Sequence, residues 1–343
     1  GYTPSAEAER VFFDAVAKMS ESSAVALIPG NHDDATRLCA SSPFGERSGA
    51  YFFGEASEEN SALLRAKTTD SARKGAWARE KGEGYAIFEN AAGEKVYLAA
   101  LPYPTEARLK ERASDIPYTD RVAGWLSDCL AANTEGLPAV LMTHVFTVGG
   151  LTTEGEREIS LGGARAVDKN SIPEVAYVAL GHLHKRQVVS ASRNIIYSGS
   201  ILQYSFDEVG VEKSVTVFDI SASGAKNIRK IPLTQGRRLA RLFFTSYEDA
   251  LQALPAYSDH VTELTLGLKS PLNREENDYL AKNYPRMKLV IRIEGEASFA
   301  SRERREMDDR ELFIGCYKKQ FGADPADELT ALYLEILMEA EEK

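Results

Sequence analysis

The sequence contains few cysteines, few histidines and no long hydrophobic run. Its three cysteines, Cys39, Cys129 and Cys316, lie far apart and form no C-x-x-C pair, which argues against a thiolate zinc site. No stretch approaches the roughly 20 consecutive apolar residues of a membrane-spanning helix. The chain also does not open with the charged and then apolar segments of a signal peptide. We therefore expect a cytoplasmic protein with reduced thiols and no membrane segment.

An excess of positive charge is also absent. The formal net charge is −10, which argues against a protein that coats nucleic acid by charge alone. DNA as a substrate is not excluded, because local basic segments exist. One contains Lys226, Arg229, Lys230, Arg237, Arg238 and Arg241. Most such segments are solvated faces, so phosphate contact is one of two interpretations.

The length and composition fit a soluble protein with a substantial core. With 343 residues, 43% hydrophobic and 27% charged, the chain can form one large domain and a smaller one. Thr3 and Pro4 favour a helix that begins with Thr3 as its cap. Residues 37–94 indicate loops, short strands and one helix. Hydrophobic patterns predict strands at 25–28, 96–101, 139–142, 175–180, 195–197 and 215–220, and a helix around 122–130.

From residue 237 onward the pattern changes to a compact α+β module. We expect strands at 239–244, 261–266 and 288–293, with helices at 247–254 and 275–283. The tail, 302–343, begins with a charge run and then indicates two amphipathic helices, which Gly322 and Pro325 separate.

The positions of the histidines are the strongest functional signal. Of the five, His32, His144, His182 and His184 fall just beyond predicted strand ends, and only His260 does not. Loops at strand ends converge on one edge of a layered α/β protein, where active sites gather. This pattern predicts that the four imidazoles meet at one site.

Each motif also has a plainer interpretation. The H-x-H spacing of His182 and His184, after Gly181, suits a divalent metal pair such as Mn²⁺, but isolated pairs are usually histidines bonded to backbone. In Gly30–Asp33 the Asn31 amide oxygen could ligate a metal and His32 could act as a general acid, yet Asn-containing turns are common. Both glycines are interpreted as permitting tight turns.

The order G-N-H-D, T-H, G-H-x-H resembles the calcineurin-like metallophosphoesterases. The flanks are similar to the SbcD family of DNA nuclease subunits in Ala179–Lys185, in Tyr197–Ser200, in Ser205–Glu208 with Lys213 after it, and in the tail from Glu311 to Leu337. Ile201 departs from the family, which usually has Pro there.

The resemblance implies an α/β (α+β) fold, with a layered β-sandwich flanked by helices. A nuclease domain would occupy 1–236, a small α+β capping domain 237–300, and C-terminal helices for docking an ATPase partner 301–343.

The resemblance also implies the site residues. Asn31, His144 and His182 would bind one metal ion and His184 a second, with Mn²⁺ as the expected metal. His32 would act on the phosphate or the leaving group. Asp33 would orient a neighbouring histidine, or else stabilise the turn. The family motifs D-x-H and G-D-x-x-D are absent from this sequence, so we expect them upstream of Gly1 and expect this chain alone to be inactive.

The implied function is DNA cleavage, as exonuclease and endonuclease, with an SbcC-type ATPase in DNA repair, recombination and replication. A homodimer is implied as well. Candidate DNA contacts are Lys185, Arg237, Arg238 and Arg241. Two other classes remain open: a metallophosphoesterase acting on a small nucleotide-like substrate, and a noncatalytic fragment that binds a partner.

Overall fold

The computed structural model describes residues 3–54, 75–105, 109, 116–148, 150–151, 166–293 and scattered positions between 313 and 333. The chain forms two compact units, Gly1–Leu239 and Ala240–Lys343. The predicted division into 1–236, 237–300 and 301–343 stays a prediction. Among the described residues, no helix combines the length and apolar character needed to cross a membrane.

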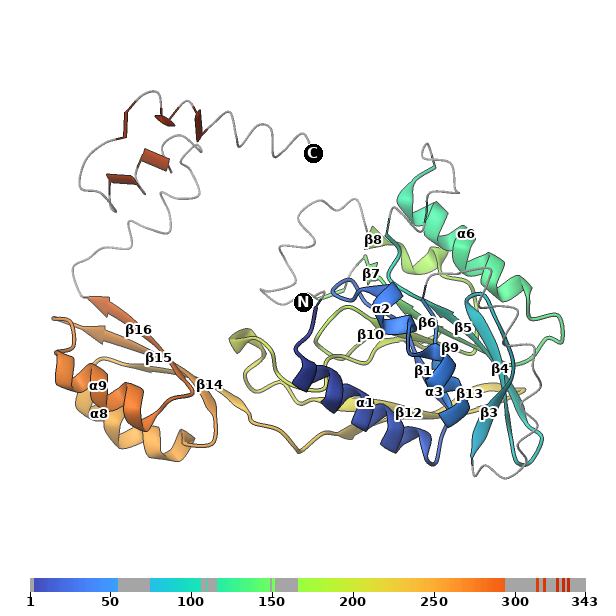
Figure 1. Cartoon of the computed structure of the whole chain (residues 1–343), viewed down its shortest axis with the longest axis horizontal. Helices are drawn as coiled ribbons and strands as arrows, with labels where there is room; N and C mark the ends of the chain where they lie inside the picture. The colour runs from blue at the N-terminus through green and yellow to red at the C-terminus, as the bar shows by residue number, and fades with distance from the viewer. Residues whose placement is uncertain are drawn as a thin grey trace. The chain divides into compact units, whose positions relative to one another are not determined.

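A seven-stranded mixed sheet forms the centre of the first unit (Figure 1). Its strands, in spatial order, are β10 (Gln187–Ser190), β11 (Ile195–Tyr197), β9 (Tyr177–Gly181), β6 (Ala139–His144), β5 (Lys95–Leu101), β4 (Tyr85–Asn90) and β3 (Ala76–Gly82). The central strands β5, β6, β9 and β11 are parallel to one another, and the remaining pairs are antiparallel. The parallel strands therefore end at one edge, as the sequence predicted.

The sheet is covered on both faces, and β5 shows why. Its side chains alternate between two hydrophobic cores, since Tyr97, Ala99 and Leu101 belong to one and Leu98 and Ala100 to the other. The first core includes Val122 and Leu126 of helix α6 (Tyr118–Ala131). The second includes Tyr51 and Phe53, in and beside β2 (Ala50–Phe52), which pairs in parallel with β1 (Val25–Leu27).

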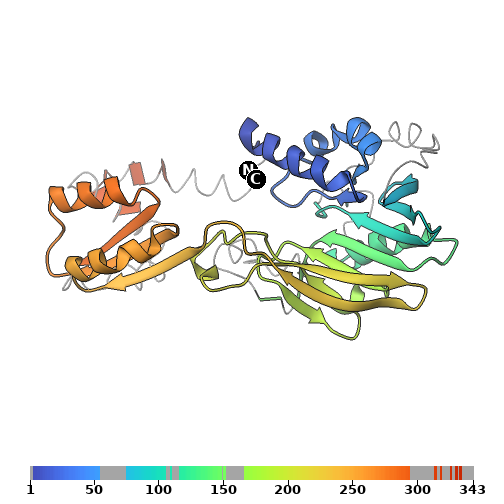
Figure 2. The ribbon, with the colours of Figure 1, turned by 90° about the horizontal axis from the view of Figure 1, so that it is seen from below.

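Helix α1 (Ala6–Ser20) packs on the other side of the β1–β2 pair, and Figure 2 shows the blue N-terminal helices on one side of the green strands. The prediction that Thr3 caps this helix is wrong. The Ser5 hydroxyl accepts a hydrogen bond from the Ala8 N–H at 3.2 Å, so the helix begins one residue after Ser5 and Pro4 lies outside it.

Several short elements complete the first unit. Residues 37–54 contain more helix than expected, because Asp34 caps one short helix and a second follows directly. The antiparallel hairpin of β12 and β13 was predicted only in its first strand, and it packs on the sheet through Phe218, which stacks on Tyr177 at 4.0 Å. The bounds are α2 (Ala35–Cys39), α3 (Ser42–Ser48), β7 (Phe146–Thr147), β8 (Ala166–Val167), β12 (Ser214–Ser221) and β13 (Gly224–Pro232).

The second unit is the predicted α+β module. Its three-stranded sheet has the order β14 (Leu239–Phe244), β15 (Val261–Leu268) and β16 (Met287–Ile293), with helices α8 (Tyr247–Ala253) and α9 (Arg274–Asn283). Leu264, Leu266 and Leu280 are buried in one core. Asn273 and Glu276 form a reciprocal capping box at the start of α9.

Little of the predicted tail can be described. Phe313 and Tyr317 are helical, and Phe313 stacks on Tyr333 at 4.3 Å. Leu312, Cys316, Leu334 and Met338, on which the prediction of amphipathic helices also depended, lie outside the described residues. The fold class is confirmed: the protein is mixed α/β, with a large mixed sheet flanked by helices and a small α+β module.

Candidate metal centre

The ends of two neighbouring parallel strands bring the predicted histidines together. His144 is the last residue of β6 and pairs with Gly181, the last residue of β9. His182 and His184 follow directly, and the rings of His144 and His182 lie 5.4 Å apart. His182 has φ +110°, a conformation that non-glycine residues seldom adopt and that often marks a functional site.

The two glycines of the motifs provide space for the ring of His144. Neither Gly30 nor Gly181 has a positive φ. A Cβ at Gly30 would lie 2.8 Å from His144 Cε1, and one at Gly181 would lie 2.8 Å from His144 Nδ1. Those distances are shorter than van der Waals contact, so any larger residue would displace the ring. The turn interpretation is wrong for Gly181, which ends strand β9, whereas Gly30 does begin a turn, because the Asp33 N–H donates to the Gly30 carbonyl at 3.4 Å.

The G-N-H-D segment follows β1 and reaches the same place. Asn31 Oδ1 lies 2.9 Å from His144 Nε2. Asp33 closes the turn, because its carboxylate accepts a hydrogen bond from the Gly30 N–H at 2.8 Å. This is the turn-stabilising alternative for Asp33. Its role in orienting a histidine stays a prediction.

All five predicted ligand and catalytic residues line one cavity of about 460 Å³. They come from three separate segments and are Asn31, His32, His144, His182 and His184. Two tyrosines that the sequence did not single out lie beside them. Tyr103 stacks on His182 at 6.3 Å, and the exposed Tyr204 lies 5.7 Å from His184 at the cavity wall.

Burial keeps one of these imidazoles neutral. Desolvation lowers the pKa of His144 to about 3, and repulsion from His182, His32 and His184 acts in the same direction. A neutral imidazole carries the lone pair that a metal requires. Imidazole nitrogens with an amide oxygen suit a borderline divalent cation such as Mn²⁺ or Zn²⁺, so the chemistry of these donors fits the predicted metal.

Carboxylates do not join this donor set in the part of the chain that the structure describes. No described Asp or Glu lines the cavity. Nor do three His, Cys, Asp or Glu side chains among the described residues form a ready metal site. Metal binding by Asn31 and the three histidines therefore stays a prediction.

The ring of His184 contacts a buried ion pair for which the sequence analysis gave no role. Glu208 Oε1 lies 3.3 Å from His184 Nδ1, and Lys213 donates a hydrogen bond to the other oxygen of Glu208. Lys213 Nζ also donates to Ser200 Oγ at 2.8 Å and to the His184 carbonyl at 2.9 Å. Only the family resemblance of the flanks pointed to Glu208 and Lys213, and it gave them no role.

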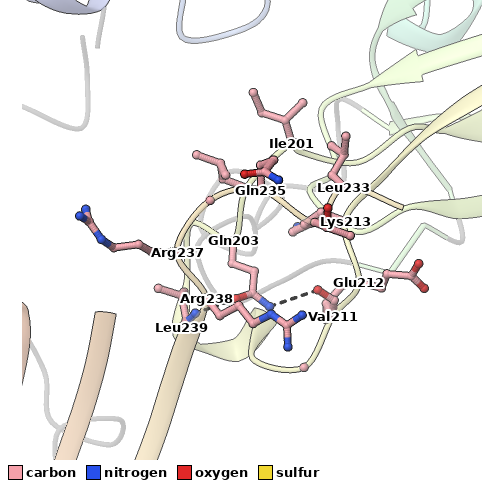
Figure 3. Close-up of a pocket in the computed structure, with 14 residues that line it drawn as sticks. Ile201, Gln203, Val211, Glu212, Lys213, Leu233, Gln235, Arg237, Arg238 and Leu239 are labelled. Carbon is pink, nitrogen blue, oxygen red and sulfur yellow. Dashed lines mark hydrogen bonds between the residues drawn. The ribbon is translucent and has the colours of Figure 1, made fainter. Parts of the chain in front are cut away.

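The candidate DNA contacts are solvent-accessible. Lys185 follows His184 and is exposed. Arg237 and Arg238 are exposed and line a second cavity of about 230 Å³ in the first unit (Figure 3), where the Arg237 side chain points away from the other labelled residues. Arg241 belongs to the second unit, where its Nε lies 2.9 Å from Glu263 Oε1. Contact of these residues with DNA stays a prediction.

No family model matches the sequence, but known proteins do. The chain is 30% identical to the SbcD subunit of the SbcCD nuclease of Bacillus subtilis, over 99% of this chain and 85% of that protein. It is 29% identical to the SbcD subunit of Rhodobacter capsulatus, over 71% of this chain and 59% of that protein. The SbcD subunit of Escherichia coli K12 is 30% identical over 31% of this chain and 27% of its own length.

Proposed function

The chain belongs to the SbcD family of SbcCD nuclease subunits, and from this premise we propose that it is a metal-dependent nuclease subunit that hydrolyses DNA phosphodiester bonds. The observation that carries the proposal is the single cavity in which the histidines of three separate segments meet. Such a convergence of imidazoles at strand ends is what a catalytic metal centre requires.

The proposed metal ligands are Asn31, His144 and His182 for one divalent cation and His184 for a second. Bound Mn²⁺ would polarise the phosphodiester and lower the pKa of a water molecule to near neutrality. The close fit of His144 against Gly30 and Gly181, and the stacking of Tyr103 on His182, hold the imidazoles in fixed positions.

His32 is the proposed catalytic residue of the protein itself. It lines the cavity but is exposed, so a substrate can reach it. Its imidazole would donate a proton to the leaving oxygen, or donate a hydrogen bond to the phosphate as negative charge develops. The neighbouring Asp33 keeps this segment in its turn through Gly30.

We further propose an SbcC-type ATPase as the partner, bound through the C-terminal helices. Two described tail leucines support this, because Leu329 and Leu332 are exposed by 39% and 51%. Exposed leucines in the described part of the tail favour a docked partner. Homodimer formation, action in the cytoplasm, and roles in DNA repair, recombination and replication belong to the same proposal.

The test is an assay of the full-length protein encoded by its gene, with and without the ATPase partner. We expect Mn²⁺-dependent cleavage of duplex DNA. His144→Ala should lose both metal binding and cleavage, whereas His32→Ala should lose cleavage and keep the metal. His260→Ala, which changes the histidine outside the cavity, should behave as wild type. Cleavage by His32→Ala at the wild-type rate would contradict the role of His32.

The same assay separates the two alternatives. Hydrolysis of a small nucleotide phosphoester with DNA left intact would favour a small-molecule phosphoesterase. Binding of the ATPase without Mn²⁺ binding or any hydrolysis would favour a noncatalytic partner-binding protein.

A further inference from the structure

Two charged side chains lie buried directly behind the cavity. Glu208 has no exposed surface and Lys213 is 8% exposed, and the two form an ion pair. Removing two charges from water is costly, and an apolar pair of similar volume is often equally stable. The stability of the fold alone therefore does not explain why this position holds a carboxylate and an ammonium group.

The contacts of the pair converge on His184. Glu208 Oε1 lies 3.3 Å from Nδ1 of the imidazole. Lys213 holds the same carboxylate through its other oxygen, and also donates to the backbone carbonyl of His184 at 2.9 Å. One ammonium group therefore fixes both the backbone of His184 and the carboxylate that contacts its ring.

A further side chain keeps the segment around Glu208 in place. Gln203 Nε2 donates to the Glu208 carbonyl at 2.9 Å and to the Val211 carbonyl at 3.1 Å, and Figure 3 shows the bond to Val211. Gln203 Oε1 accepts from the Leu239 N–H at 2.8 Å. These hydrogen bonds tie Gln203 to the backbone around Glu208, so they hold the Glu208 segment in one conformation.

The carboxylate of Glu208 faces one particular ring nitrogen of His184, Nδ1. A carboxylate that is paired with an ammonium group accepts hydrogen bonds, so a hydrogen bond between Glu208 and His184 requires Nδ1 to be the donor. A neutral imidazole protonated at Nδ1 carries its lone pair on Nε2. Carboxylates that orient metal-ligating histidines in other proteins act in this way.

We propose that Glu208 is a positioning residue that selects the Nδ1–H tautomer of His184, and that Lys213 holds Glu208 in the orientation this requires. The use of the Nε2 lone pair for a metal rests on the proposed function. The tautomer itself does not, because it can be measured in the metal-free protein.

The test replaces both charges together, since removal of one would leave the other buried and unpaired. Glu208→Met/Lys213→Met keeps the approximate volume and removes the acceptor. A matched control is Glu46→Met/Lys81→Met, which removes another largely buried ion pair. The Glu46 side chain is 13% exposed and the Lys81 side chain is 9% exposed, and neither residue lines the cavity. The readouts are the ¹⁵N chemical shifts of His184 in the metal-free full-length protein and the Mn²⁺ dissociation constant.

In the wild type and in the control, we expect His184 Nδ1 to be protonated. In Glu208→Met/Lys213→Met we expect a shift toward the Nε2–H tautomer and a rise of roughly 10- to 100-fold in the Mn²⁺ dissociation constant. A purely structural role would leave the tautomer unchanged and would affect both double variants alike.

Two results would overturn the inference: a wild-type His184 protonated at Nε2, or an unchanged tautomer in Glu208→Met/Lys213→Met. Failure of the proposed function gives a different result. In that case no variant binds Mn²⁺, while the ¹⁵N shifts still decide whether Glu208 selects the tautomer.

Discussion

Asn31 Oδ1 lies 2.9 Å from His144 Nε2, although 113 residues separate the two in the sequence. The contact joins the segment after β1 to the end of β6. The Asn31 amide oxygen only accepts hydrogen bonds, so Nε2 of His144 is the donor in this contact, and a cation that replaced its proton would be bound by both atoms. Gly30 and Gly181 enclose the His144 ring and limit its movement. This contact therefore defines the point in the cavity where a shared cation is expected.

The first prediction concerns that contact. Asn31→Ala removes the amide oxygen and leaves the imidazole, so we expect the Mn²⁺ dissociation constant to rise by at least about tenfold, the size of effect seen when the shell around a metal ligand is altered. The measurement is isothermal titration calorimetry. Asn283→Ala, in α9 of the second unit, is the control and should match the wild type. Equal affinity in both variants would remove Asn31 from the ligand set.

The second prediction concerns the space around His144. Gly30→Ala and Gly181→Ala each place a methyl group 2.8 Å from a ring atom, so the ring must move. We expect weaker Mn²⁺ binding, a changed His144 signal in NMR spectra, and destabilisation of about 1–3 kcal/mol from overpacking. Gly267→Ala is the control, because its Cβ would lie 3.3 Å from the Phe243 ring, a longer distance that requires a much smaller adjustment. An unmoved His144 ring in both site variants would contradict the steric role.

The meeting of the histidines could be predicted from the sequence because strand ends are visible there. Apolar runs before His144 and before His182 predict two strands whose ends meet at one edge, and β6 and β9 prove to be a neighbouring parallel pair. What a glycine does at such an edge was harder to see. The sequence shows that Gly181 lacks a side chain, but only the tertiary structure shows that the vacated space belongs to His144.

Elements without a hydrophobic period could not be predicted in this way. Strand β13 is polar and largely exposed, and its existence depends on pairing with β12. The burial of Glu208 likewise depends on Lys213 and on the loop that Gln203 closes. Hydrophobic patterns assign charged residues to the surface, so they cannot predict that an ion pair is buried.

The third prediction concerns Tyr197, which is fully buried beside the segment that follows His144. Its hydroxyl donates to the Val145 carbonyl at 2.7 Å and accepts from the Thr147 N–H at 2.9 Å. Tyr197→Phe leaves those backbone groups buried with one partner fewer, so we expect a loss of about 1–3 kcal/mol in the free energy of unfolding. Urea denaturation measures it. Tyr279→Phe, at a side chain 48% exposed, should change little.

The fourth prediction concerns pH and the second unit. The hydrogen bond from Lys288, at 2.8 Å, is the main cause that lowers the pKa of Glu263. A carboxyl whose pKa is lower in the folded state adds stability above its unfolded pKa and loses it as the pH falls through the folded value. The partner side chains of Arg241 and Lys288 are 47% and 64% exposed, so the contribution to stability is below about 1 kcal/mol.

Glu263→Gln should therefore be less stable than the wild type at neutral pH, and the two should converge below the usual range of a glutamate pKa. Thermal unfolding across pH measures the difference. A difference that grows as the pH falls would contradict the sign of the shift.

The fifth prediction compares three arginines as DNA contacts. Arg237 and Arg238 are exposed, whereas Arg241 is already paired with Glu263. Breaking that pair to reach a phosphate offsets part of the gain, so Arg237→Ala and Arg238→Ala should weaken duplex DNA binding more than Arg241→Ala. Each lost phosphate contact should also reduce the log–log salt slope by about 0.9. Fluorescence anisotropy at several salt concentrations measures both quantities.

The control for that comparison is Arg10→Ala in α1, an arginine 67% exposed that is paired with Asp14. Arg10→Ala and Arg237→Ala each remove one positive charge. A loss of DNA affinity that is equal in the two variants therefore reflects the change in net charge and no local contact. The proposed contact requires Arg237→Ala to lower the salt slope while Arg10→Ala leaves it unchanged. If the two variants give the same slope, DNA does not bind at the surface formed by Arg237 and Arg238, and the local basic segment is a solvated face.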